Sequence, residues 1–326
     1  SFENMKIYRL PVLFKISNTP INLFWYFQLK KIIKNENPTI INAHLPVPFI
    51  GDLACLIEPK KCIITYHNDL VKQDLIGNFL CKSYYFFIGD RTLSNCKRII
   101  ATSEYYAKNS IYLNKYLSKI SIVPPGVDVS KFNENIKKGY FKDKTSKLFF
   151  IAQLDKTHNH KGLKYLIEAV SIVKKSIPNI RLYIGGKGDY INYYKQYAKK
   201  LNLNNEIKFL GFISDGDLPL IYKDSNIVIL PSYNKCEGFG MVLAEANACG
   251  TPIIGTNIGG IPVVIEDNYN GLLVPPKDSE ALAKAIMGIL KNKPFAEKLG
   301  QNGAKKSKEL WDWNKLAKKT EEVFEK

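Results

Sequence analysis

Short runs of apolar residues alternate with helix-like segments along most of this 326-residue sequence. The runs are rich in isoleucine and valine and end in a turn or a polar group, which is typical of buried strands in a parallel sheet. They lie near residues 39–44, 61–67, 98–103, 119–126, 147–154, 181–188, 206–212, 226–232, 251–257 and 271–276. Helical patterns occupy residues 161–177 and 279–292. This alternation predicts an α/β protein with doubly wound, Rossmann-like sheets.

The strand-like runs form two series, which indicates two domains. Residues 133–147 between them, NENIKKGYFKDKTSK, are polar, charged and without a period. We expect a first domain at residues 1–135 with about four strand and helix units, and a second at residues 136–305 with about six. Residues 306–326 are expected to form a carboxy-terminal helix that packs back on the first domain.

The composition indicates an anionic partner without identifying it. The chain carries 47 basic and 30 acidic side chains, a formal net charge of +17, which attracts phosphates, anionic membranes or nucleic acid. The alternative is that the scattered lysines only keep the surface soluble. The six cysteines show no zinc-type spacing and are typical of reduced, mostly buried thiols in a cytoplasmic protein. No apolar run is typical of a simple membrane-spanning helix.

Residues 237–245, EGFGMVLAE, place two carboxylates eight positions apart around a pair of glycines. Ligands of an open parallel sheet bind beyond the carboxyl ends of its strands, and this stretch follows such a run. We expect a helix to begin near Gly240 or Met241, with its free amides facing a diphosphate. Glu245 would then lie about 6 to 8 Å along the helix, the step from a diphosphate to a ribose. Alternatively, Glu237 and Glu245 only complement the helix dipole.

In its full context this stretch resembles the donor-site signature of the retaining glycosyltransferases of family four, which have the GT-B fold. The matching segments are EGFGMVLAEANACGTPIIGTNIGGIPVVI, from Glu237, and NGLLVPP, from Asn270. The resemblance extends from about Asn42 to Lys291. It implies two Rossmann-like domains that face a cleft. It also implies transfer of a hexose from a nucleotide diphosphate sugar, a UDP- or GDP-hexose, with retention of the anomeric configuration.

The resemblance also implies roles for individual residues. Glu237 would contact the transferred sugar, Glu245 would hold the ribose, and Lys161 would bind the diphosphate. Without the resemblance, Lys161 is typical of a surface residue at a helix start. The donor-binding residues expected on this basis are Gln153, Lys161, Gly186, Glu237, Gly238, Phe239, Gly240, Met241, Val242 and Glu245.

The chain departs from the family pattern at Gln153, where the family usually carries an arginine. This substitution puts the second positive charge of the donor site in doubt. His158 and His160, in a local insertion, are alternative sources of charge, or else they are solvated loop residues. The glycine turn at residues 185–189 resembles the family's turn near the base and phosphates, and residues 255–265 resemble the loop that borders the sugar.

The first domain is expected to supply the acceptor side. His67 follows a strand-like run and resembles the family's active-site histidine, so it joins Glu237 and Lys161 as a candidate catalytic residue. A lone histidine in such a place is otherwise a packed or hydrogen-bonded residue. For His44, which ends another run, a structural role is favoured. Gly126 resembles the turn before the interdomain link.

One element of the family has no counterpart before Ile40, the glycine-rich loop that helps to bind acceptor and diphosphate. We expect the first domain to be truncated at its start rather than to have lost this loop. A doubly wound domain without its central strand would leave an open sheet edge.

Residues 20–34, PINLFWYFQLKKIIK, combine aromatic bulk with a lysine cluster, as interfacial helices do. They indicate peripheral contact with the anionic inner face of the plasma membrane. The alternative is a helix that covers the sheet, with Phe24, Tyr26 and Leu29 directed inward.

The expected reaction needs no cofactor and no metal ion, because a lysine and helix amides would stabilise the departing diphosphate. The expected acceptor is a glycan or lipid-linked hydroxyl in cell-surface polysaccharide, lipopolysaccharide or glycolipid synthesis, and no nucleic acid partner is expected. Within the same fold, a phosphorylase or an epimerase is a rival interpretation. Outside enzymes, the rival is an inactive scaffold that binds a polyanion or a membrane.

Overall fold

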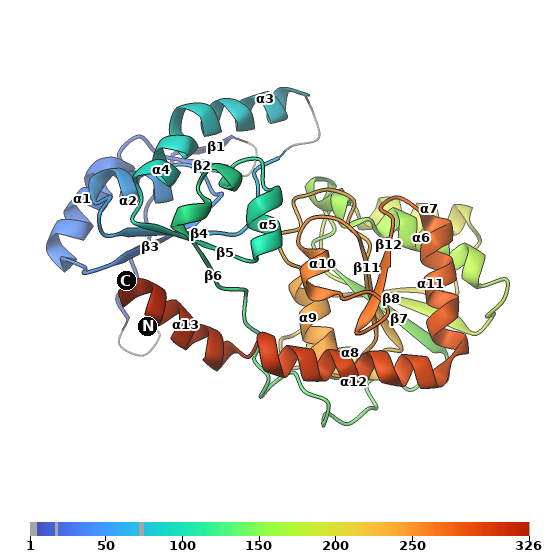
Figure 1. The fold of residues 1–326 in the computed structure, drawn as a ribbon. Coiled ribbons are helices and arrows are strands. Elements are labelled where there is room, and N and C mark those ends of the chain that lie inside the picture. Colours follow the sequence, from blue (N-terminus) through green and yellow to red (C-terminus); the bar gives the residue numbers. More distant parts are fainter. Residues whose placement is uncertain (1–4, 17–18, 72–74, 326) are drawn as a thin grey trace. The chain divides into compact units, whose positions relative to one another are not determined.

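The computed structural model describes residues 5–16, 19–71 and 75–325, and the chain divides into two compact units. The N-terminal unit comprises Ser1–Val123 together with Glu321–Lys326, and the C-terminal unit comprises Pro124–Thr320. In each unit a parallel sheet is flanked by helices (Figure 1). The predicted α/β class and the parallel sheets are therefore confirmed.

The N-terminal unit is built on a parallel sheet of order β3-β4-β5-β6. Its strands are β3 (Ile41–Leu45), β4 (Cys62–Tyr66), β5 (Arg98–Ala101) and β6 (Ile120–Ile122). The main helical segments of the unit are α1 (Trp25–Glu36), α2 (Ile50–Ile57), α3 (Leu75–Tyr84), a π-helical turn (Tyr85–Gly89), α4 (Asp90–Asn95) and α5 (Glu104–Asn109). Ile63, Ile64 and Ile99 on the two central strands are buried, as apolar runs in parallel strands predict.

A short antiparallel hairpin precedes this sheet, formed by β1 (Phe14–Ile16) and β2 (Thr19–Ile21). The sequence pattern does not predict it, because each strand has three residues and a proline lies within β2. In α1, the buried residue is Trp25, whose indole Nε1 donates a hydrogen bond of 2.9 Å to the Pro11 carbonyl oxygen. Phe24 is 60% exposed, so the interpretation that directs Phe24 inward is wrong.

The C-terminal unit contains a parallel sheet of order β12-β11-β10-β7-β8-β9. Its strands are β7 (Ser146–Ile151), β8 (Ile180–Gly185), β9 (Ile207–Gly211), β10 (Ile227–Leu230), β11 (Ile253–Thr256) and β12 (Gly271–Val274). The helices are α6 (Leu163–Val173), α7 (Ile191–Lys200), α8 (Leu218–Asp224), α9 (Met241–Ala248), α10 (Ile261–Val264), α11 (Ser279–Lys291) and α12 (Lys293–Leu310). Helix α6 packs beside α11, and α12 packs beside α9 (Figure 1).

The strand order of this sheet reverses at β7. The chain moves outward from β7 to β8 and β9, then returns to the other side of β7 with β10, β11 and β12. At such a reversal the loops after the two neighbouring strands, here β7 and β10, diverge and leave a crevice in which ligands bind. The topology therefore predicts that a ligand binds near the residues that follow Ile151 and Leu230.

The start and the end of the C-terminal unit are joined by backbone hydrogen bonds. The Val127 amide donates to the Trp311 carbonyl at 2.6 Å, and the Trp313 amide donates to the Val127 carbonyl at 3.0 Å. Phe132 is buried beside Tyr222, with ring centroids 6.0 Å apart. Residues 124–135, which the sequence groups with the first domain, thus lie in the C-terminal unit.

The carboxy-terminal segment consists of two helices that meet near Trp311. Residue 306, where a single final helix was expected to begin, lies inside α12, and α13 (Trp313–Glu325) follows after a short break. The break coincides with the pairing of Trp311 and Trp313 to Val127. Among the described helices, none is long and apolar enough to cross a bilayer.

Candidate functional site

The loops after β7 and β10 meet in a small polar cluster. Lys161 Nζ lies 2.7 Å from Glu237 Oε2, and the Ser232 hydroxyl donates a hydrogen bond of 3.0 Å to the same oxygen. Glu237 is only 7% exposed. A buried carboxylate is stable when a cation and a hydrogen-bond donor compensate for its lost hydration, and this cluster provides both.

A glycine brings the two loops together. Gly162, directly after Lys161, has φ of +78°, and a Cβ atom at this position would collide with the Pro231 carbonyl oxygen. The six-residue helical turn before it, Lys156–Lys161, is capped by Asp155, whose side chain accepts from the His158 amide. The glycine after Lys161 therefore has a local cause, because only glycine permits this close approach of the two loops.

Two further glycines fix the loop that carries Glu237. The Gly260 amide donates to the Glu237 carbonyl oxygen at 2.7 Å. A Cβ atom on Gly259 would collide with that same carbonyl oxygen, and one on Gly260 would collide with the Gly238 carbonyl oxygen. Residues 255–265, which resemble the family's sugar-bordering loop, thus act here as the support against which the Glu237 loop packs.

Helix α9 begins beside this cluster, as the sequence predicts. Gly240 is its cap residue with φ of +94°, and the amides of Met241 and Val242 come before the first hydrogen bonds of the helix. The Phe239 side chain is buried and contacts Trp311 edge to face at 5.8 Å between ring centroids. Phe239 therefore anchors the loop through its ring, so that only its backbone can take part in ligand binding.

Glu245 lies within α9 and is held by a tyrosine of the neighbouring helix α8. The Tyr222 hydroxyl donates to Glu245 Oε2 at 2.9 Å, whereas Oε1 has no hydrogen-bond partner among the described residues. Burial raises the pKa of this carboxyl, and the Tyr222 bond and the Lys131 ammonium lower it in part. One oxygen thus remains as an acceptor, as recognition of a ribose hydroxyl would require.

Gln153 and the glycine turn lie at the carboxyl end of β7 and β8. Gln153 is exposed, and Gly186, with φ of +119°, has no room for a Cβ atom because of the Ala152 carbonyl oxygen. The Lys187 carbonyl accepts from the Leu154 amide at 2.8 Å. Lys187 is a cation at this edge that sequence reasoning missed, and its ammonium lies 4.9 Å from the ring centroid of the exposed Phe212.

The two histidines proposed as substitutes for the arginine are engaged locally. His158 Nδ1 lies 2.8 Å from Asp155 Oδ1, and His160 Nδ1 donates to the Thr157 carbonyl at 3.2 Å. Burial and the neighbouring Lys161 ammonium lower the pKa of His160. His160 is therefore uncharged at neutral pH and does not supply the missing positive charge.

In the N-terminal unit, His67 and His44 form a pair. His44 Nδ1 lies 2.8 Å from His67 Nε2, and the rings stack with centroids 5.0 Å apart. The adjacent strands extend this contact, because Asn42 Nδ2 lies 3.4 Å from His44 Nε2 and the Thr65 hydroxyl donates to Asn42 at 2.8 Å. Burial and His44 lower the pKa of His67, so His67 is neutral at pH 7 and its Nδ1 remains for a ligand.

Sequence reasoning missed the side chains that hold the two glutamates, Ser232 and Tyr222. Ser232 follows β10 by two positions, and a polar residue at the carboxyl end of a strand at the reversal point is a signal that the pattern does contain. Tyr222 lies on α8 far from Glu245 in sequence, and no local pattern connects the two residues. No group of three or more metal-ligating side chains occurs within the described ranges.

Comparison with known families gives two adjacent matches. Residues 131–306 match the family described as Glycosyl transferases group 1, and residues 3–131 match Glycosyltransferase Family 4. The O-antigen chain mannosyltransferase C of Escherichia coli is 26% identical over 95% of this chain and 81% of its own length. An uncharacterized glycosyltransferase of Methanocaldococcus jannaschii is 30% identical over 99% of this chain and 85% of its own length.

Two solved structures with the same fold have equal TM-scores against this chain. A glycosyltransferase from Rickettsia africae has a TM-score of 0.75 at 22% identity, covering 95% of this chain and 83% of its own. The Anabaena protein HepE in complex with UDP and glucose has a TM-score of 0.75 at 19% identity, covering 94% of this chain and 84% of its own. These similarities support the two-domain fold of GT-B proteins.

Proposed function

Because the chain belongs to the group 1 glycosyl transferases and is a glycosyltransferase, we propose that it moves a hexose from a nucleotide diphosphate sugar to an acceptor hydroxyl. The acceptor hydroxyl belongs to a glycan or to a lipid-linked glycan in cell-surface polysaccharide or glycolipid synthesis. The relatives that carry this part of the proposal are an O-antigen chain mannosyltransferase and a D-rhamnosyltransferase.

One observation carries the proposal: Lys161 and Glu237 lie 2.7 Å apart where the strand order of the C-terminal sheet reverses. An ammonium group has three donors, of which one is used by Glu237, so two remain for oxygens of a diphosphate. The amides of Met241 and Val242, at the start of α9, add the positive end of a helix dipole. This combination fits the leaving group of a nucleotide diphosphate sugar.

The remaining donor contacts follow from the position of the groups along α9. Glu245 accepts a hydrogen bond from a ribose hydroxyl through its free Oε1, and Glu237 accepts hydrogen bonds from hydroxyls of the transferred sugar. Gly186 allows the backbone to approach the base and phosphates closely, and exposed Gln153 contacts the diphosphate as a neutral donor. The donor is a UDP- or GDP-hexose, and HepE, of the same fold, binds UDP-glucose.

The transfer retains the anomeric configuration. The bond between the anomeric carbon and the diphosphate oxygen breaks as the acceptor oxygen bonds to the same face of the sugar. The departing phosphate oxygen takes the proton of the acceptor hydroxyl, so no protein base is needed beneath the ring. Lys161 and the helix amides stabilise the charge on the leaving diphosphate, and neither a metal ion nor a cofactor takes part.

His67 is the residue that the N-terminal unit contributes to this reaction. As a neutral imidazole held by His44 at 2.8 Å, it offers Nδ1 to a hydroxyl of the sugar or the acceptor. Its lowered pKa keeps it uncharged near pH 7, so it does not repel the positive charge that develops on the sugar ring.

The protein acts in the cytoplasm, where it contacts the anionic inner face of the plasma membrane. Two sets of side chains around α1 support this contact. Leu23 and Phe27 are 76% and 68% exposed, and Lys30, Lys31 and Lys34 follow them as exposed cations. Apolar side chains beside lysines are the combination that interfacial helices use on anionic lipid.

The test of the proposed reaction compares two substitutions in purified protein. Replacement of Glu237 by Gln is expected to reduce transfer at least a thousandfold, because it removes the charge that faces the sugar. Replacement of Glu245 by Ala is expected to raise the Kd of the nucleotide about tenfold and to leave the sugar contacts in place. Transfer from UDP-, GDP- and ADP-sugars is measured, and nucleotide binding is followed by thermal shift.

Unchanged turnover in Glu237→Gln would contradict the assigned role of that residue. The absence of binding to any of these nucleotides in the wild-type chain would favour the scaffold interpretation instead.

A further inference from the structure

A polar hollow of about 350 Å³ lies at the amino-terminal edge of the C-terminal sheet, where β7, β10 and β11 begin. This edge is opposite to the carboxyl ends that carry Glu237 and Lys161. We call it the basal hollow and define it by Lys138, Ser146, Lys223, Asn226, Leu290 and Lys293. We propose that the basal hollow is a second binding site of the protein and that it binds a phosphate monoester.

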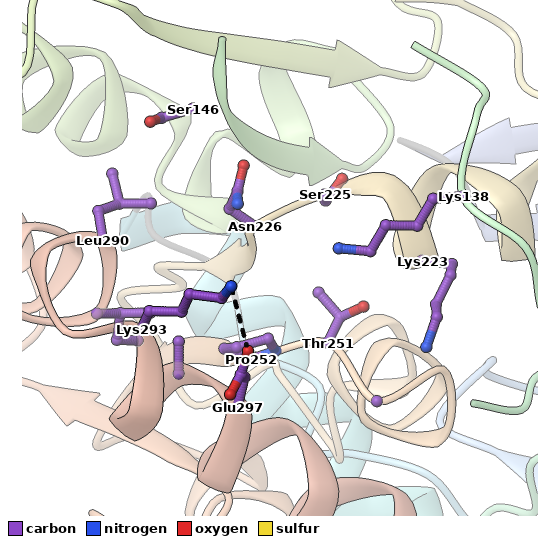
Figure 2. A pocket seen from close by; sticks show the side chains of 13 residues that line it. Lys138, Ser146, Lys223, Ser225, Asn226, Thr251, Pro252, Leu290, Lys293 and Glu297 are labelled. Atoms are coloured by element: carbon purple, nitrogen blue, oxygen red, sulfur yellow. Dashed lines mark ion pairs between the residues drawn. The ribbon is translucent and has the colours of Figure 1, made fainter. Parts of the chain in front are cut away.

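The walls of the basal hollow come from several elements of the C-terminal unit. Ser146 opens β7, and Asn226 directly precedes β10. Lys138 comes from the segment before β7, and Lys293 opens α12. Figure 2 shows the side chains of Lys138 and Lys293 extending from opposite sides of the hollow toward its interior. The hollow is thus formed by separate elements that converge, rather than by a single lysine-rich loop.

Cations outnumber anions in the lining. Three lysines line the basal hollow, whereas the carboxylate in the lining, Glu297, lies 3.8 Å from Lys293 Nζ. Lys223 donates to the Cys249 carbonyl at 3.1 Å and has no carboxylate bonded to it among the described residues. Burial and the nearby Lys138 ammonium lower the pKa of Lys223, although Glu134 opposes this in part. An anion bound between Lys138 and Lys223 would remove this repulsion.

Hydrogen-bond donors are available beside these cations. Asn226 Oδ1 accepts from the Lys147 amide at 2.8 Å, which fixes the orientation of the side chain and leaves its Nδ2 without a partner among the described residues. Within the described residues, no side-chain hydrogen bond is made by the Ser146 hydroxyl or by the Lys138 ammonium. A phosphate group, which carries three terminal oxygens in a monoester, can accept from all three.

The basal hollow also has apolar lining residues and is too large for a phosphate ion alone. Pro252, Ile289 and Leu290 contribute apolar surface to the lining, from the end of α11 and the position just before β11. A free phosphate would leave this surface in contact with water. A phosphate monoester whose organic group lies on Ile289 and Leu290 would bury it, and this apolar contact adds to the affinity.

The experiment titrates the full-length chain with phenyl phosphate, inorganic phosphate and phenol by isothermal calorimetry. Phenyl phosphate is expected to bind at least tenfold more tightly than inorganic phosphate, and phenol is expected not to bind. Lys138→Gln, at an exposed position, is expected to weaken phenyl phosphate about tenfold by removing one charge-assisted contact. Lys138→Gln combined with Lys223→Gln is expected to abolish binding.

Two control variants distinguish binding in the basal hollow from diffuse charge attraction and from binding at the donor site. Lys284→Gln removes the same charge from the exposed face of α11, outside the hollow, and is expected to bind phenyl phosphate as the wild type does. Lys161→Gln is expected to retain binding as well, because the candidate donor site lies at the other end of the sheet. If Lys284→Gln and Lys138→Gln lose the same affinity for phenyl phosphate, binding depends only on net charge. If Lys161→Gln loses binding, phenyl phosphate binds at the candidate donor site. Either result overturns the proposal.

Discussion

The environment of Glu237 depends on very few side chains. Its Oε2 receives an ammonium and a hydroxyl, from Lys161 and Ser232, and the loop backbone around it is fixed by Gly259 and Gly260. The Ser232 carbonyl is itself bonded by the buried Thr256 hydroxyl. The orientation of the carboxylate is therefore set by Lys161, by the Ser232 hydroxyl and by the packing of the glycine loop.

Replacement of Ser232 by Ala is expected to lower the rate of transfer about tenfold. A hydrogen bond to a charged group contributes about 1.5–3 kcal/mol, and without it Glu237 is free to rotate around its contact with Lys161. Steady-state kinetics at saturating donor would measure the loss. The matched control is Ser171→Ala, which removes a hydroxyl from α6 that bonds only the Glu168 carbonyl; a similar loss of rate there would contradict the assignment.

The contribution of Glu245 to the stability of the fold depends on pH. Burial raises its folded pKa above the ordinary value of 4.5, so the folded state favours the protonated carboxyl. This contribution to stability is present below pH 4.5 and is lost as the pH rises through the folded pKa. We therefore expect Glu245→Gln to unfold at a higher temperature than the wild type at about pH 7.5, while it binds nucleotide more weakly.

Thermal unfolding from about pH 4 to pH 8 would measure this difference. The advantage of Glu245→Gln should shrink as the pH falls toward 4.5. An advantage that is constant across this range would show that the ionisation of Glu245 is not its cause.

At the scale of elements, the close packing of the loops after the strands of the C-terminal sheet depends on glycines. Gly162→Ala is expected to lower the free energy of unfolding by about 2 kcal/mol or more, because the position has positive φ and the new methyl group meets the Pro231 carbonyl oxygen. Gly288→Ala is the control, since α11 leaves open space around this position and alanine favours a helix by about 0.5–1 kcal/mol. Urea unfolding should give opposite signs for the two variants.

The strands of both main sheets could be predicted from the sequence, and much of the packing could not. Apolar runs such as residues 61–67 and 226–232 became strands because a parallel strand must bury both of its faces. The helix start at Gly240 followed from the same local chemistry. The hairpin β1–β2, by contrast, has too few residues to form a recognisable pattern. The burial of Trp25 depends on its hydrogen bond to the Pro11 carbonyl oxygen, which the local sequence does not reveal.

For the candidate site, the sequence singles out Lys161 and Glu237, but it does not reveal their contact or the side chains that support them. Lys161 and Glu237 are separated by 76 positions, and their contact follows only once the order of β7 and β10 is known. The Tyr222 bond to Glu245 depends on how α8 packs against α9, which no periodicity encodes. The exposed Gln153 remains a departure from the family pattern, and the neutral His160 does not replace the missing charge.

At the scale of the whole molecule, the formal charge of +17 should govern association with membranes. We expect the protein to float with vesicles that contain phosphatidylglycerol and not with pure phosphatidylcholine, and we expect the bound fraction to fall steeply between about 0.05 and 0.3 M salt. The combined substitution of Lys30, Lys31 and Lys34 by Gln should weaken this binding at least tenfold.

A matched triple variant of exposed lysines on another helix, Lys195, Lys199 and Lys200 of α7, controls for net charge. If it loses as much binding as the α1 variant, the contact is diffuse attraction and does not involve α1 as a specific surface.

The backbone bonds between Val127 and residues 311–313 have a consequence for how such a protein can diversify. They hold the first residues of the C-terminal unit, which begins at Pro124, next to the start of α13, in which the unit ends at Thr320. A recombination event that exchanges residues 124–320 as one cassette keeps both junctions intact.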